Sequence, residues 1–158
     1  MCIRDSYNPN YALAAQKRTT MVDKLRHALM LDELFLVFQP QLCARKEKVV
    51  GIETLLRWRH NDNIISPAEF IPLAEKSGLI VPIGKWILEQ AALFTKGLIQ
   101  QGYFDIVVAV NVSPRQFSHP TFIETVKEVL INTGLPPENL ELEITEGVFM
   151  HNLSLIHI

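Results

Sequence analysis

Short apolar runs alternate along this chain with stretches of helical periodicity, and this alternation leaves few folds open. The runs expected to form strands are Leu34–Gln41, Glu47–Trp58, Ile106–Val112 and Leu140–Thr145. Apolar spacing and capping residues predict helices over Met21–Leu31, from Pro67 to Ser77–Gly78, over Ile83–Gln101 and over Thr121–Thr133. Such alternation is typical of α/β proteins with parallel strands buried on both faces. The pattern alone leaves a barrel and an open sheet as alternatives.

Composition excludes several classes of protein. With 158 residues, 48% hydrophobic and 20% charged, the chain can bury the core of one domain and is neither disordered nor fibrous. Fifteen basic residues against 17 acidic ones give a net charge of −2, so no general attraction to duplex nucleic acid is expected. No apolar stretch approaches the roughly 18 residues that span a bilayer. Two cysteines, Cys2 and Cys43, cannot build a disulfide framework, which favours a cytoplasmic location.

The two ends of the chain look foreign to it. When Met1–Ser6 is back-translated, it lies within the reverse complement of the codons for Leu153–Ile158. Both hexapeptides are similar to a transposon mosaic end used as a sequencing adapter, so we expect adapter-like scars at 1–6 and 153–158. The polar segment 7–20 is then an expected interdomain linker, and 21–152 is the expected domain.

Polar side chains occur near the carboxyl ends of three expected strands. Glu53 shares a strand face with apolar residues, Asn111 follows Ile106–Val110, and Glu143 lies in the run LELEITE. Taken singly, each of these polar residues can be explained without a functional site, because strand ends reach water and Asn favours turns. Their recurrence where parallel sheets place their sites favours a divalent metal site with oxygen ligands, suited to Mg²⁺ or Mn²⁺.

Six ordered motifs give the chain a family resemblance. Together they resemble the EAL-domain cyclic di-GMP phosphodiesterases, over about Met21 to Met150. The motifs are Phe38-Gln39-Pro40, Glu53-Thr54-Leu55-Leu56-Arg57-Trp58, Phe70-Ile71-Pro72-Leu73-Ala74-Glu75, Gly78-Leu79-Ile80, Asn111-Val112-Ser113 with Gln116, and Glu143-Ile144-Thr145-Glu146.

The resemblance implies a fold and an activity. The family fold is a modified (β/α)₈ barrel whose first strand is antiparallel to the others, and this chain would cover about its first half. The family hydrolyses cyclic di-GMP to linear pGpG with two Mg²⁺ or Mn²⁺ ions. A homodimer and an upstream GGDEF domain, joined through segment 7–20, are also implied. The implied metal ligands are Glu53, Asn111 and Glu143; Glu146 supports a catalytic loop; Gln39, Leu55 and Arg57 line the dinucleotide.

Two departures from the family pattern bear on activity. Thr54 replaces the Ala of the Glu-Ala-Leu signature; alternation directs it away from Glu53 toward the helices, so we expect the change to be tolerated. The family's paired aspartates, catalytic Lys and last Glu would follow Met150, so we expect the chain alone to be inactive and, with unpaired strand edges, prone to aggregate. The alternatives left open are a silent EAL domain that senses cyclic di-GMP or binds a protein, and a metal enzyme of another barrel family.

Overall fold

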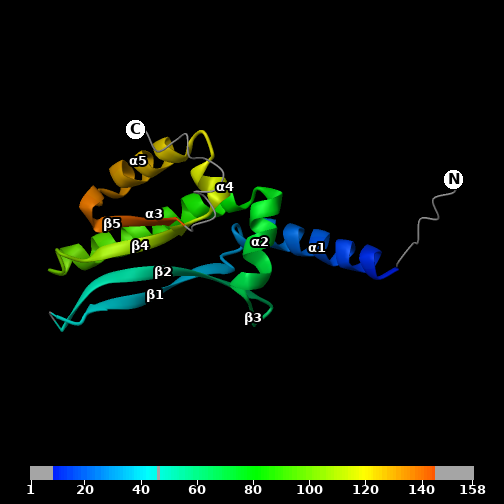
Figure 1. Ribbon diagram of the computed structural model, residues 1–158, viewed down its shortest axis with the longest axis horizontal. Helices are drawn as coiled ribbons and strands as arrows, with labels where there is room; N and C mark the ends of the chain where they lie inside the picture. The colour runs from blue at the N-terminus through cyan, green and yellow to red at the C-terminus, as the bar shows by residue number, and fades with distance from the viewer. Residues whose placement is uncertain (1–8, 46, 145–158) are drawn as a thin grey trace.

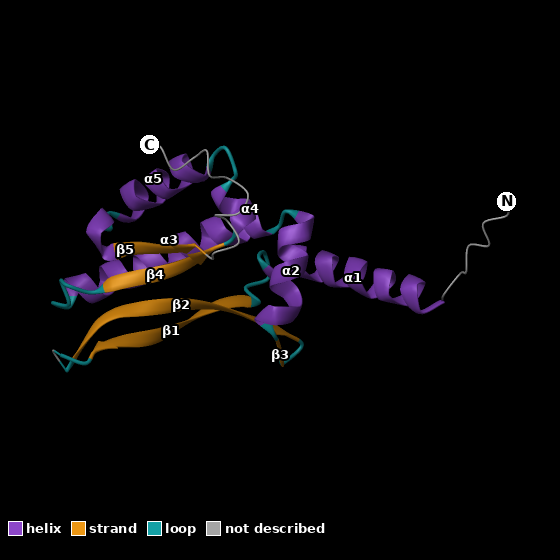
Figure 2. Cartoon of the chain, in the orientation of Figure 1, coloured by secondary structure: helices purple, strands orange, loops and turns teal. Residues whose placement is uncertain are grey.

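The computed structural model describes residues 9–45 and 47–144, so Glu146 and both adapter-like hexapeptides lie outside the described residues. The described elements form a single mixed sheet with helices packed against it (Figures 1 and 2). In chain order they are α1 (Pro9–Ala28), β1 (Leu34–Cys43), β2 (Lys48–His60), β3 (Asn63–Ile65), α2 (Pro67–Ser77), α3 (Ile80–Gln100), β4 (Val107–Val112), α4 (Pro114–Phe117), α5 (Phe122–Thr133), the 3₁₀ helix η1 (Pro137–Asn139) and β5 (Leu140–Ile144).

The strand order of the sheet is β1-β2-β4-β5, with the short β3 paired to the end of β2. β1 and β2 form an antiparallel hairpin, whereas β4 runs parallel to β2 and β5 runs parallel to β4. An α/β fold with an antiparallel first strand was predicted, and the structure confirms it. Because β1 and β5 do not pair with each other, the described sheet is open, as in part of a barrel.

The core lies between one face of this sheet and the helices. The side chains of Ile52, Leu56 and Trp58 of β2 point to the helix side of the sheet and into that core. Val108 and Val110 of β4 continue the core on the same side. Helix α3 contributes more buried residues than any other described helix, and α5 packs against α3. The ring of Trp58 is fully buried and meets Phe70 of α2 edge-on, with centroids 5.5 Å apart.

The other face of β2 is not buried as expected. Glu53, Leu55 and Arg57 alternate with the core residues and are only half-buried. The expectation that the strands are buried on both faces is therefore wrong for β2. The physical reason is that all the helices that pack on the sheet cover the same face, and the opposite face belongs to the inner side of an open sheet.

Most helix boundaries follow from local signals. Helix α2 starts at Pro67 and ends at Ser77, and its C-cap Gly78 has a φ of 83°, in the left-handed region that ends helices. The side chain of Ser66 makes no capping hydrogen bond, so Pro67, with its preset φ, is the remaining start signal. Gly134, with φ 66°, ends α5 in the same way, as predicted.

Helix α1 starts far earlier than the predicted Met21. It begins at Pro9 and its amino-terminal half projects away from the sheet (Figure 1). The polar composition of 7–20 led to the prediction of a linker. This stretch nevertheless favours a helix, because it has no Gly, contains Ala12, Ala14 and Ala15, and has Pro9 in the first helical turn, where proline is tolerated. A helix there is compatible with a connecting role, and that role stays a prediction.

Strand β3 was not predicted, because its signal is short. The two-residue loop Asn61-Asp62 joins it to β2 and has φ values of 47° and 63°, as a type I′ turn requires. His60 and Asn63 are the paired residues that flank this loop. The dipeptide Asn-Asp tolerates positive φ, so it was the one sequence feature that could have indicated a hairpin.

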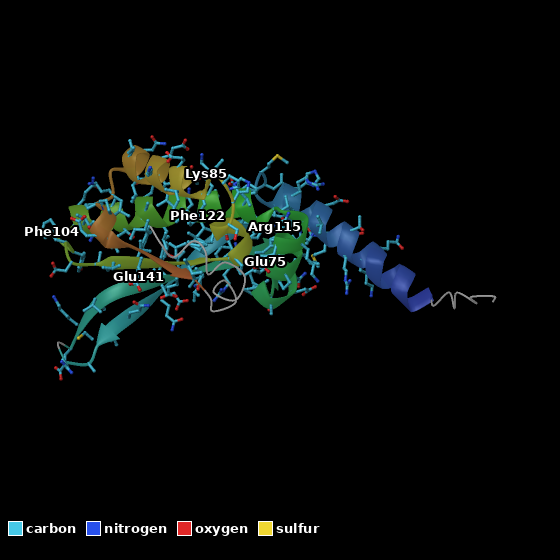
Figure 3. All side chains as sticks on the ribbon, turned by 45° about the horizontal axis from the view of Figure 1, so that its top comes forward. Glu75, Lys85, Phe104, Arg115, Phe122 and Glu141 are labelled. Carbon is cyan, nitrogen blue, oxygen red and sulfur yellow. The ribbon has the colours of Figure 1, made fainter. Side chains whose placement is uncertain are left out.

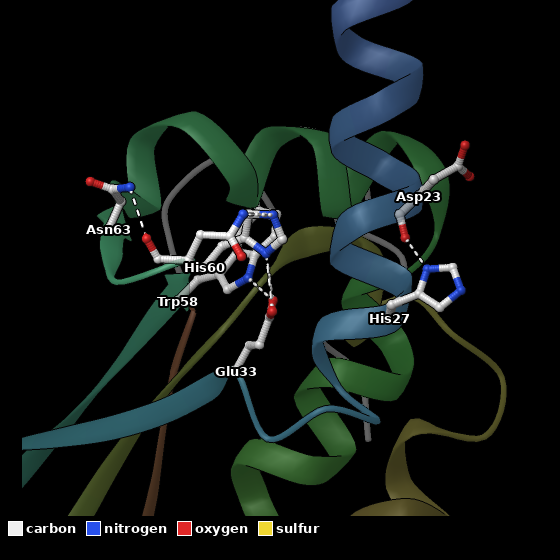
Figure 4. Close-up of polar contacts among 7 residues, drawn as sticks. Asp23, His27, Glu33, Trp58, His60 and Asn63 are labelled. Carbon is white, nitrogen blue, oxygen red and sulfur yellow. Dashed lines mark hydrogen bonds and ion pairs between the residues drawn. The ribbon is translucent and has the colours of Figure 1, made fainter.

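A carboxylate fixes the corner where α1 leads into β1. Glu33 accepts a hydrogen bond from Nε1 of Trp58 at 3.0 Å and contacts Nδ1 of His60 at 3.0 Å (Figure 4). The Trp58 hydrogen bond is the main reason that the pKa of Glu33 lies below its usual 4.5, and contacts with His60 add to this effect. The Glu33 carboxylate therefore joins the start of β1 to the far end of β2.

Candidate functional site

Three oxygen-bearing side chains share the inner face of the sheet. In the register, Glu53 of β2 is opposite Ala109 of β4, and Asn111 of β4 is opposite Glu143 of β5. Because every second residue of a strand faces the same side, this pairing places Glu53, Asn111 and Glu143 on one face of three neighbouring strands. The structure therefore brings together the three residues that were expected to converge.

A hydrogen bond joins two of these side chains. Nδ2 of Asn111 donates to Oε1 of Glu53 at 3.0 Å, although the two residues are 58 positions apart in the sequence. Asn111 and Glu143 end their strands side by side, since they are direct partners in the parallel pair β4–β5. Asn111 and Glu143 thus lie toward the carboxyl ends of β4 and β5, the edge at which parallel sheets place their chemistry. Glu53 lies in the middle of β2, so the expectation that it is near the carboxyl end of its strand is wrong, because β2 continues past the sheet edge to pair with β3.

The surroundings of Glu143 disfavour its charged form. Burial raises the pKa of Glu143, and the negative charges of Glu53 and Glu141 raise it further. Glu141 is exposed and lies on the same face of β5. A cation that approaches the ionised Glu143 would offset this unfavourable environment.

The residues expected to line a dinucleotide lie on the same face. Gln39 of β1 is the cross-strand partner of Glu53, and Val37 and Phe35 are the partners of Leu55 and Arg57. Nη1 of Arg57 donates to the backbone oxygen of Leu56 at 2.8 Å, which fixes one side of its guanidinium group. Gln39, Glu53, Leu55 and Arg57 therefore form one continuous surface along the β1–β2 hairpin.

The donor set fits a hard divalent cation. Within the described residues, no three His, Cys, Asp or Glu side chains are grouped to hold a metal, so any metal here would need the amide as well as the carboxylates. Two carboxylates and one carboxamide are ligands of the kind that Mg²⁺ and Mn²⁺ accept. Asn111 now turns its amide nitrogen to Glu53, and rotation of the amide would present Oδ1 instead.

Thr54 lies where alternation predicts. It faces the helices, is 3% exposed, and lies near Ile71, Ile80 and Ile87 around one small pocket. Its hydroxyl Oγ1 is fully buried and has no hydrogen-bond partner. The threonine is thus accommodated sterically, while its hydroxyl remains unsatisfied.

The short helix α4 that follows Asn111 was not predicted, although Ser113 and Gln116 belong to one of the six motifs. Ser113 and Gln116 form a reciprocal capping box around α4, and Arg115 reaches back to the end of α2. The sequence Ser-Pro-Arg-Gln carried the signal, since Ser with Gln three positions later and Pro in the first turn predicts a helix start. The interaction of Arg115 with α2 had no local signal.

The fold and the inner-face cluster define an α/β protein of partial-barrel form with an acidic site at the strand ends. The comparison with protein families makes the assignment more specific. The family model described as "EAL domain" matches residues 22–157, and the chain therefore belongs to the EAL domain family.

Relatives of known name agree with this assignment. The chain is 39% identical over 139 residues to the bifunctional diguanylate cyclase/cyclic di-GMP phosphodiesterase MucR of Pseudomonas aeruginosa, a match that covers 87% of this chain and 20% of MucR. It is 34% identical over 140 residues to the cyclic di-GMP phosphodiesterase NbdA of the same species, covering 88% of this chain and 18% of NbdA. The chain thus spans about a fifth of the length of these relatives.

Solved structures show the same fold. The chain resembles the PaMucR phosphodiesterase in complex with c-di-GMP with a TM-score of 0.81 and 39% identity, covering 84% of this chain and 54% of that one. It resembles the Xanthomonas citri FimX EAL domain in complex with c-diGMP with a TM-score of 0.76 and 27% identity, covering 88% and 54%. Both similarities extend over about half of the solved chain.

Proposed function

We propose that the chain is part of a metal-dependent phosphodiesterase that hydrolyses cyclic di-GMP to linear pGpG. The observation that carries this proposal is the joining of Asn111 to Glu53 by a 3.0 Å hydrogen bond on the face that also holds Glu143. The names of MucR and NbdA supply the substrate. An upstream GGDEF domain, as the name of bifunctional MucR suggests, and a homodimer are part of the same proposal.

Glu53, Asn111 and Glu143 would hold a Mg²⁺ or Mn²⁺ ion. When bound, such an ion polarises a phosphodiester and lowers the pKa of its water. The chain's own contribution is to keep two carboxylates and an amide on adjacent strands, where their mutual repulsion favours the ion. Glu146, outside the described residues, is proposed to steady a catalytic loop.

The remaining residues of the face would bind the dinucleotide. The guanidinium group of Arg57 can pair with phosphate oxygens or with a guanine edge, and its contact with the backbone of Leu56 sets its direction. Gln39 can donate and accept hydrogen bonds, and Leu55 offers an apolar surface to a base. All three lie on the same face as Glu53, so binding and chemistry would occur on one side of the hairpin.

The test measures conversion of cyclic di-GMP to pGpG by chromatography. The longest gene product that contains this chain is assayed with Mn²⁺, with EDTA, and as Glu53→Ala and Glu141→Ala. We expect EDTA and Glu53→Ala to abolish turnover and Glu141→Ala to preserve it, because Glu141 is exposed beside the site without joining the three ligands. Unchanged turnover in Glu53→Ala would exclude Glu53 as a ligand.

The second candidate is a catalytically silent domain that binds cyclic di-GMP as a signal. The FimX EAL domain that the chain resembles is in complex with c-diGMP, which supports binding of this ligand, the property that both candidates share. Binding measured by calorimetry distinguishes the two candidates in the same preparation. Binding of cyclic di-GMP without hydrolysis in the presence of Mn²⁺ would establish the silent domain. For the 158-residue chain assayed alone, we propose no turnover.

A further inference from the structure

The turn after β4 is held to two helices at once, and it begins two residues after Asn111. Within the turn, the backbone N–H of Gln116 donates to Oγ of Ser113 and the backbone N–H of Ser113 donates to Oε1 of Gln116, both at 3.2 Å. This reciprocal pair fixes the conformation of residues 113–116, so the turn moves as one unit. Whatever anchors the turn therefore also anchors the end of β4.

Arg115 anchors the turn to the carboxyl end of α2. Its Nη1 donates to the backbone oxygens of Glu75 at 2.7 Å and Lys76 at 3.2 Å, and Figure 3 shows Arg115 beside Glu75. These oxygens belong to the last turn of α2, where the Glu75 oxygen also accepts the backbone N–H of Gly78 at 3.2 Å. The positive guanidinium group also suits the negative end of the helix dipole. Arg115 thus satisfies α2 and fixes the turn in the same contact.

Gln116 anchors the turn to α3 through a close approach to Gly84. Gln116 is 6% exposed, and a Cβ atom built on Gly84 would overlap its amide nitrogen. Gly84 lies inside α3, where glycine costs about 1 kcal/mol relative to alanine. That cost is explained if the position must leave room for the Gln116 amide.

We propose that Arg115 and Gln116 are positioning residues for the metal ligand Asn111. They hold the carboxyl end of β4 against α2 and α3, so that the Asn111 side chain stays within reach of Glu53. Among the described residues, neither side chain is hydrogen-bonded to Glu53, Asn111 or Glu143, and each acts through the backbone of 111–113. This inference rests on the proposed metal site, and it adds to that site a support that lies outside the inner face.

The experiment measures two properties of the 158-residue chain. The first is the Mn²⁺ dissociation constant, from titration followed by electron paramagnetic resonance. The second is the side-chain amide signal of Asn111 in ¹⁵N NMR, assigned with an Asn111→Asp variant. The variants are Arg115→Ala, Arg115→Lys and Gly84→Ala, which displaces Gln116 without changing it. Val129→Ala, in the buried core of α5, is the matched destabilised control.

We expect Arg115→Ala and Gly84→Ala to weaken Mn²⁺ binding about tenfold, as loss of a ligand's outer support commonly does. The Mn²⁺ dissociation constant of Arg115→Lys should lie between those of these two variants and that of the parent chain, because an ammonium group can still donate to one carbonyl. In both weakened variants the Asn111 amide signal should shift or broaden. Val129→Ala should lower the melting temperature while leaving the dissociation constant and the amide signal unchanged.

The inference is overturned if folded Arg115→Ala and Gly84→Ala keep the parent's dissociation constant and amide signal, or if Val129→Ala loses as much affinity as they do. If Arg115→Ala does not fold, the same two measurements on Arg115→Lys and Gly84→Ala test the inference. If the parent chain binds no Mn²⁺, the metal part of the proposed function fails instead. The positioning role is then decided by the amide signal alone: a change supports it and an unchanged signal overturns it.

Discussion

Removal of the Glu33 carboxylate should destabilise the chain by leaving a buried donor without an acceptor. Trp58 is 0% exposed, and its indole N–H donates to Glu33 at 3.0 Å. A buried donor that loses its acceptor costs about 1–3 kcal/mol. We therefore expect Glu33→Ala to lower the free energy of unfolding by about 2 kcal/mol, and Glu33→Gln by about 1 kcal/mol or less, because its amide oxygen can still accept.

The same contact predicts an acid dependence. The pKa of Glu33 lies below 4.5 in the folded chain, chiefly because of the Trp58 hydrogen bond. A depressed carboxyl pKa stabilises the fold above the unfolded value, and this contribution is lost as the pH falls through the folded value. The parent chain should thus lose this contribution below about pH 4.5, and Glu33→Gln should lack that part of the loss.

Urea unfolding followed by tryptophan fluorescence measures both effects, at pH 7 and at several values from pH 5 down to pH 3. Glu128→Ala is the matched control, because Glu128 forms an exposed ion pair with Lys85 at 3.4 Å and such pairs contribute little. The reasoning is refuted if Glu33→Ala unfolds at the same urea concentration as Glu128→Ala. It is also refuted if Glu33→Gln and the parent chain show the same acid profile.

Three further substitutions have expected outcomes. Thr54→Val removes a buried hydroxyl that has no partner, so calorimetry should show a free energy of unfolding higher by about 1 kcal/mol. Asn139→Ala removes two hydrogen bonds, of 3.1 and 2.7 Å, to backbone oxygens before β4 and should cost about 2 kcal/mol in urea unfolding. Glu143→Gln relieves repulsion with Glu53, so it should raise the melting temperature without metal and abolish the rise that Mn²⁺ causes; a parent-like response to Mn²⁺ would contradict this role.

Local signals predicted those parts of the fold that depend on neighbouring residues. The ends of α2 and α5 are fixed by Pro67 and by the glycines at 78 and 134, which act within a few residues of the sequence. The early start of α1 at Pro9 was missed because polar residues are as compatible with a solvated helix as with a linker. The short β3 was missed because only pairing with β2 makes three residues a strand.

The candidate site was predictable in its residue types and faces but not in its contacts. The alternation of side chains along a strand predicted that Glu53 and Thr54 point to opposite faces of the sheet, and the structure confirms this. That Asn111 pairs with Glu143, and that its amide reaches Glu53, depends on strand register, which no local pattern fixes. Recurrence on three expected strands grouped these residues as one site, and the family resemblance implied the same three ligands.

The sheet separates stability from chemistry between its two faces. On the helix side, Ile52, Leu56 and Trp58 are buried, and the contacts of Arg115 and Gln116 lie among the helices. On the inner side, burial and then the negative charges of Glu53 and Glu141 raise the pKa of Glu143, which costs stability until a cation is present. Because the anchors of the turn lie among the helices, the repulsive cluster can be held in place without apolar packing around it. The anchored turn and the ligand Asn111 are joined through the backbone of β4, and this makes residues 111–113 the point at which a change in the packing of α2 or α3 would reach Asn111.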